Sequence, residues 1–248
     1  MVAALFLNQS SKFGITDIDD YPAHAGVNID RTGIVGEWYA ASALLAADGA
    51  QVSCVPNMTP GASSAALPGA GDLLSQSGTG APAYVNNGLN GAPSILLDGT
   101  NDRMLALFPL VQPCTLYHAI KPLTFVSGER LIGTQTALQG GDIFFSGTSP
   151  NVRASAGTQS GLNANLTLGN WHVVATVFNG ASSVLRIDNT TETTGDFGAN
   201  NPNGLTIGGA LAVATAHMEW AASFAFNTAH DGARRAATVA AIQAALGI

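Results

Sequence analysis

The stretch "GNWHVVATVFNGASSVLRIDN", residues 169–189, decides the fold class. A tryptophan opens an apolar run, an Asn-Gly pair interrupts it, and a second apolar run ends in Ile-Asp. Asn179 and Gly180 both tolerate the positive φ angles of a tight turn, so the stretch predicts a β-hairpin. The first run is apolar on both faces, which predicts a central strand of a sheet that is covered on both sides.

Other stretches repeat the strand pattern on either side of this hairpin. The segment "CTLYHAIKP", residues 114–122, alternates, with Leu116, His118 and Ile120 on one face. The segment "HMEWAASFAFN", residues 217–227, has a strict period of two. Its large side chains are predicted to share one face that points into the core: Met218, Trp220, Ala222, Phe224 and Phe226.

The C-terminal segment changes from the strand period to the helix period. Val239, Ile242 and Leu246 recur at helical spacing on an alanine-rich background. We expect one amphipathic helix over about residues 232–246, with Thr228 or Asp231 capping its start.

The composition limits the possible partners. The chain has 248 residues, of which 46% are apolar and 10% charged, with a net charge of −7. This length is normal for one all-β sandwich domain, and the net charge disfavours a nucleic-acid partner. No apolar run approaches the length of a membrane span, and the N-terminal apolar patch is too short for a signal peptide. Low charge density also leaves a surface suited to contact with other subunits, so a homo-oligomer is expected.

Irregular segments lie before the regular strands. Residues 1–36 have no sustained period and are predicted to form an extended N-terminal arm. Residues 53–90 are rich in Gly, Pro and Ser, and a loop this long is usually functional or packed on a neighbour. Cys54 and Cys114 lie far apart and form no CxxC motif, so two free, half-buried thiols are favoured over a disulfide.

Four motifs in the expected order resemble those of the concanavalin A-like lectin/glucanase domains of the laminin-G-like group. They are "EWYAAS" at 37–42, "LNGAPSILLDGTNDRM" at 89–104, the hairpin at 169–189, and "GLTIGG" followed by "HMEWAASFAFN". The resemblance covers about residues 36–248, and versions of this domain occur in bacteriophage virion proteins. It implies an all-β, two-sheet antiparallel jelly-roll sandwich over residues 37–248, including the C-terminal helix. Ala40 and Asn189 depart from the Asp and Gly of the pattern, which loosens any site that depends on those two positions.

Candidate site residues are few. No paired carboxylates stand in the spacing that retaining glycosidases of this fold use, so no catalytic residue is assigned. Trp38, Tyr39 and Tyr84 lie near predicted loops and are the best candidates for an aromatic platform that binds sugar. Asp98, Asn101 and Asp102 could supply oxygen ligands to calcium; capping of the Asp-Gly turn and of the next strand is the favoured alternative.

The sequence is compatible with two main functions of different class. The first is a non-enzymatic virion structural protein: a phage capsid-decoration, fibre or tail-associated module made in the host cytoplasm and exposed on the virion surface. Its N-terminal arm would hold a capsid or tail protein of the same particle, and its sandwich could bind glycans weakly. The second is a cellular carbohydrate-binding adhesin, and a glycoside hydrolase or polysaccharide lyase is the third possibility.

Overall fold

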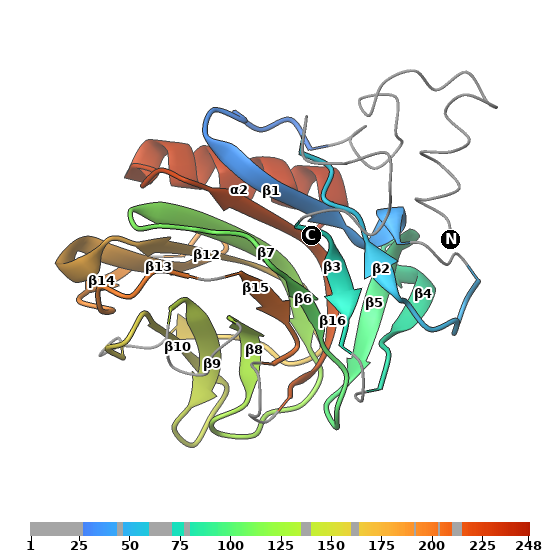
Figure 1. Cartoon of the computed structure of the whole chain (residues 1–248). Helices are drawn as coiled ribbons and strands as arrows, with labels where there is room; N and C mark the ends of the chain where they lie inside the picture. The colour runs from blue at the N-terminus through green and yellow to red at the C-terminus, as the bar shows by residue number, and fades with distance from the viewer. Residues whose placement is uncertain are drawn as a thin grey trace.

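The protein is a β-sandwich with one helix packed on its outside, as the computed structural model shows (Figure 1). The described residues are 27–43, 47–59, 71–76, 80–134, 140–159, 164–190, 192–202, 204–209 and 215–248. Two antiparallel sheets face each other, and helix α2 (Gly232–Leu246) lies on the outer face of the first sheet. The predicted all-β fold with two antiparallel sheets and one C-terminal helix is therefore confirmed.

The first sheet contains the hairpin from which the fold was predicted. Its strands, in spatial order, are β14 (Thr193–Gly195), β13 (Ser183–Ile187), β12 (His172–Phe178), β7 (Cys114–Pro122), β16 (His217–Phe226), β5 (Ala92–Asp98) and β4 (Ala83–Leu89). Strand β1 (Ile34–Tyr39) pairs with the second half of β16, and β5 pairs with the first half. Every residue of β12 is buried, as expected for a strand inside a sheet that is covered on both faces.

The second sheet is made largely of short strands. In spatial order they are β11 (Ala164–Asn165), β10 (Asn151–Ser155), β9 (Asp142–Ser146), β8 (Arg130–Gly133), β15 (Leu205–Ile207), β6 (Met104–Ala106), β3 (Leu73–Ser75) and β2 (Cys54–Val55). Strands β2, β3 and the adjoining β4 fall within the loop-rich residues 53–90. No strand period is visible there, because β2 and β3 are short and the Asn-Asn-Gly sequence at residues 86–88 interrupts β4.

The apolar side chains form two separate cores. The larger core fills the space between the sheets and contains residues such as Trp38, Phe145 and Trp220. The second core lies between the first sheet and the helix, where Val239 and Ile242 of α2 are fully buried. The helix is thus held by its apolar stripe, as its period predicts.

Strand β16 does not keep one face towards one core. A β-bulge shifts its register against β7 between Trp220 and Ala222. The extra residue reverses the alternation, because side chains of a strand alternate with a period of two. Met218 and Trp220 therefore face the core between the sheets, whereas Ala222, Phe224 and Phe226 face the helix. The prediction of a single large face was wrong for this reason.

The Asn-Gly pairs at residues 90–91 and 179–180 adopt different turns. Asn90 and Gly91 have φ angles of 47° and 89° and join β4 to β5 as a two-residue turn. Asn179 has a φ of −153°, and the chain continues into a 3-10 turn, η4 (Gly180–Ser182). The predicted hairpin exists, but its tight turn at residues 179–180 was wrong because the loop needs extra residues.

The ends of the domain also differ in part from expectation. Asp231 caps α2 by accepting a hydrogen bond from the backbone N–H of Arg234 at 2.8 Å, so Asp231 is the capping residue. Residues 1–26 of the predicted arm lie outside the described residues, and its last three residues, 34–36, belong to β1. Among the described residues, no helix is long and apolar enough to span a bilayer.

The two cysteines are free, as predicted, but they are fully rather than half buried. Cys54 lies in β2 of the second sheet and Cys114 in β7 of the first. Burial raises the pKa of each thiol to about 12. Both therefore stay protonated near neutral pH, which makes them poor nucleophiles.

Candidate functional site

The three aromatic residues expected to form a sugar-binding platform are in the interior. Trp38 is 0% exposed and donates a hydrogen bond from Nε1 to the carbonyl of Gly71 at 2.8 Å. Tyr39 is 4% and Tyr84 5% exposed. A ring must be accessible to stack on a sugar, so in this conformation these residues serve the cores instead. The sequence placed them near loops, whereas Trp38 and Tyr39 end β1 and Tyr84 lies in β4.

The loop that holds the candidate calcium ligands is closed by its own hydrogen bonds. One carboxylate oxygen of Asp98 accepts from the backbone N–H groups of Thr100 and Asn101, at 2.7 and 3.2 Å. Asp102 accepts from the N–H of Asp98 at 3.0 Å. These hydrogen bonds are the capping contacts that were the favoured alternative to calcium binding, and both carboxylates take part in them. The described residues contain no group of three or more His, Cys, Asp or Glu side chains that could hold a metal.

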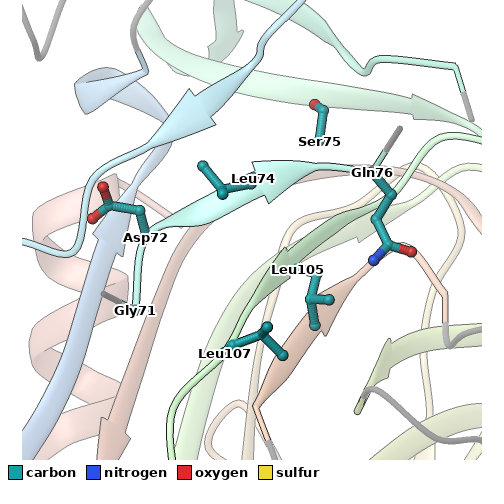
Figure 2. Close-up of a pocket in the computed structure, with 7 residues that line it drawn as sticks. All are labelled: Gly71, Asp72, Leu74, Ser75, Gln76, Leu105 and Leu107. Atoms are coloured by element: carbon teal, nitrogen blue, oxygen red, sulfur yellow. The ribbon is translucent and has the colours of Figure 1, made fainter. Parts of the chain in front are cut away.

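A pocket of about 370 Å³ opens beside β3 and β6 of the second sheet (Figure 2). Leu74 of β3 pairs directly with Leu105 of β6, and Leu107 follows that strand. Their neighbours Leu73 and Met104 point into the core between the sheets, so alternation directs Leu74 and Leu105 to the outer face. The described lining residues are Gly71, Asp72, Leu74, Ser75, Gln76, Leu105 and Leu107.

The polar groups of the pocket lie at its margins. Figure 2 shows Asp72 at one end of the row of leucines and Gln76 at the other. Asp72 is 2% exposed and accepts hydrogen bonds from the backbone N–H of Asn57 at 2.8 Å and the thiol of Cys54 at 3.9 Å. Ser75 donates its hydroxyl to the carbonyl of Val52. The pocket therefore presents leucine methyl groups along its length, with an amide at one end.

One feature of the sequence pointed to this pocket, but its lining residues were not predicted. Gly71–Gln76 fall within the loop-rich residues 53–90, which were expected to be functional or packed on a neighbour. The leucines were missed because two three-residue strands show no period, and only their pairing in the sheet brings Leu74 and Leu105 together.

A second polar cluster lies on the outer face of the first sheet. The Lys121 ammonium is 2.5 Å from one carboxylate oxygen of Glu219, and the Ser94 hydroxyl donates to the other at 2.6 Å. Lys121 also lies 5.6 Å from the centre of the Trp171 ring, whose Nε1 donates to the carbonyl of Gly88 at 3.2 Å. Glu219 lies on the outward face of β16 with a lysine and a serine as its partners. Its partners come from strands far apart in sequence and engage both its oxygens, so we read the cluster as structural.

His172 closes the end of the hairpin, in line with the expectation of a packed histidine. Its Nδ1 lies 2.7 Å from Asp188, which also accepts the backbone N–H of Val173 at 2.7 Å. Burial alone would lower the pKa of His172, but the hydrogen bond and the charge of Asp188 outweigh burial and raise it. The stability that this pair contributes is complete below the ordinary pKa of about 6.5 and is lost as pH rises through the folded-state value.

We expect Asp188→Asn to lower the free energy of unfolding by about 1–2 kcal/mol at pH 6 and by less at pH 8. Asp188 has a φ of 51°, which asparagine also tolerates, so the variant tests the charge and not the backbone. Urea unfolding at the two pH values measures the effect. An equal loss at both would show that the charge on His172 plays no part.

Solved structures share this architecture at low sequence identity. Domain 4 of AbnA, a GH43 extracellular arabinanase from Geobacillus stearothermophilus in complex with arabinotriose, matches with a TM-score of 0.50 at 11% identity, covering 64% of this chain and 82% of that one. Trypanosoma rangeli sialidase matches with a TM-score of 0.60 at 11% identity, covering 96% and 38%. A GH54 α-L-arabinofuranosidase matches with a TM-score of 0.56 at 11% identity, covering 79% and 51%. No protein-family model and no curated protein sequence matches the chain.

These matches correct the expectation of a non-enzymatic virion structural protein. The similar structures described above are an arabinanase domain, a sialidase and an arabinofuranosidase, and none of the three is a virion protein. They give no support to a capsid, fibre or tail role, or to the assignment of the chain as a non-enzyme. The chain spans only 38% of the sialidase and 51% of the arabinofuranosidase. At this identity the likeness establishes the β-sandwich fold.

Proposed function

We propose that this chain is a carbohydrate-active protein whose sandwich binds a polysaccharide at the leucine-lined pocket of the second sheet. The observation that carries the proposal is the pocket itself, about 370 Å³ in volume and lined by side chains of two paired strands. Ligand sites in proteins are commonly concave, mostly apolar, and about 300–1,000 Å³ in volume. As part of the proposal, the sandwich belongs to the concanavalin A-like lectin/glucanase group that its four motifs resemble.

The position of the pocket supports binding of an extended chain. Helix α2 occupies the outer face of the first sheet (Figure 1). The pocket lies on the outer face of the second sheet. The C–H faces of sugar rings can pack on Leu74 and Leu105, and the Gln76 amide offers a planar group for hydroxyls. The AbnA domain was solved with arabinotriose, so a sandwich of related fold holds an oligosaccharide in that protein.

We expect Leu107→Asp to weaken glycan binding at least tenfold, because a charge at the rim must be desolvated when sugar covers it. Leu107 is 54% exposed, so the fold should tolerate the change. Binding is measured by glycan array and by calorimetry with the oligosaccharides that the array identifies, and reducing-sugar release from the same glycans tests for hydrolysis.

Val126→Asp is the matched control for this experiment. Val126 is also 54% exposed but lies in the loop between β7 and β8 and does not line the pocket. The Val126→Asp variant should bind glycan with the same affinity as the unaltered protein. The proposal fails if the unaltered protein binds no glycan, or if both aspartate variants bind equally well.

A further inference from the structure

The pocket offers no positive charge to a ligand. Among the seven described residues that line it, Asp72 is the only ionisable one. Its carboxylate is held by Asn57 and Cys54 and is almost wholly buried. A sugar carboxylate placed over the leucines would lose its hydration and would gain no cation in return. An uncharged sugar loses much less, because its C–H face is apolar and its hydroxyls can remain at the rim.

Most basic side chains elsewhere in the described part of the chain are engaged in ion pairs, whereas Arg153 of β10 donates to the Gln159 side chain at 3.5 Å. These pairs are Arg31–Glu37, Lys121–Glu219, Arg130–Asp142, Arg186–Glu192, Arg235–Glu192 and Arg234–Asp30. The whole chain carries a net charge of −7, which repels polyanions at long range. Both the pocket and the molecule as a whole therefore disfavour an acidic ligand.

Arg103 is the basic residue next to the pocket. It precedes β6, and its carbonyl accepts the backbone N–H of Gln76 at 3.4 Å, but it is not a lining residue. Because Arg103 directly precedes β6, it is the basic side chain with which we test attraction of an acidic sugar to this pocket. It therefore provides the variant that separates the two ligand classes.

We infer that the pocket takes neutral glycans and discriminates against glycans that carry carboxylates, such as uronic-acid or sialic-acid chains. This inference rests on the proposed function and names the substrate class of the same pocket. The recognition is made by the packing of uncharged sugar rings on Leu74, Leu105 and Leu107, with the amide of Gln76 at the end of the row.

Calorimetry with matched ligands tests the inference. The neutral probes are arabinan, xylan and β-glucan oligosaccharides, and the acidic probes are oligogalacturonides and sialyllactose, all at physiological salt. We expect the best neutral probe to bind at least tenfold more tightly than any acidic one. Arg103→Gln should leave the affinity for the best neutral probe within twofold of its original value. Leu107→Lys adds a cation at the rim of the pocket, so it should reduce the ratio of neutral to acidic affinity.

The outcomes separate the inference from the proposed function. Acidic probes that bind as tightly as neutral ones, with loss of that binding in Arg103→Gln, would overturn the inference and leave glycan binding intact. Equal binding of both classes that Arg103→Gln does not change would overturn it as well. Absence of binding to every probe and to the wider glycan array would overturn the proposed function itself.

Discussion

Replacement of Glu37 by alanine is expected to lower the free energy of unfolding by about 3 kcal/mol or more. Glu37 is 0% exposed and lies in β1. Its carboxylate accepts two hydrogen bonds from Arg31, at 3.1 and 2.9 Å, and one from the hydroxyl of Tyr39 at 2.5 Å. Alanine removes the acceptors of a buried hydroxyl and of a half-buried guanidinium together, and such groups are costly to leave unpaired.

Two further variants test whether the loss of stability comes from the buried position of Glu37 or from the loss of an ion pair in general. Glu37→Gln keeps the shape of the side chain and one acceptor oxygen, and it should lose less stability than alanine. Asp30→Asn breaks the 3.0 Å pair with Arg234, but the Asp30 side chain is 56% exposed, so the loss of stability is expected to be much smaller than that of Glu37→Ala. Urea unfolding at pH 7.5 compares the three. Equal losses for Glu37→Ala and Asp30→Asn would contradict the role of Glu37 as a buried hub.

Protonation linked to two buried histidines, His118 and His230, is expected to lower the free energy of unfolding by about 4 kcal/mol between pH 7.5 and pH 5, whereas the His172–Asp188 pair acts in the opposite direction. Burial lowers the pKa of His118 to about 3, and burial together with the charge of Arg234 lowers that of His230 to about 4. Each histidine has a pKa of about 6.5 when unfolded, so the unfolded chain binds more protons as pH falls. The stability is present above pH 6.5 and is lost below it, by about 2 kcal/mol per histidine at pH 5.

His118 gives the cleaner test because it lies wholly inside the core between the sheets. Its Nδ1 is 2.8 Å from the hydroxyl of Ser223, and its Nε2 has no hydrogen-bond partner among the described residues. His118→Leu should remove about half of the pH dependence, as measured by urea unfolding at both pH values. A variant whose stability falls with pH as steeply as before would show that His118 does not titrate as described.

The strands of the fold could be predicted where a long apolar pattern ran without interruption. The segments 114–122 and 217–227 gave β7 and β16 almost to the residue, and the helical period over 232–246 gave α2. Strands of two or three residues, such as β2 and β3, could not be predicted, because they are shorter than the window needed to detect a period. The pocket is built from such strands, so its residues were missed.

Burial of the aromatic residues also could not be read from local sequence. Tyr84 lies next to segments rich in Gly and Ser, yet β4 pairs with β5 and carries it into the core between the sheets. The bulge in β16 could not be predicted from local sequence either. It arises from the pairing of β16 with β7, and the alternation along β16 gives no sign of it.

The sequence by itself determined that this protein is an antiparallel sandwich with one C-terminal helix, because side-chain periodicity and helix capping act between residues close along the chain. Only the tertiary structure decided which face each half of β16 covers, which aromatic rings are buried, and where a pocket opens. Those features depend on strand register and on the pairing of distant segments, and a shift of one residue in register exchanges the buried and exposed faces.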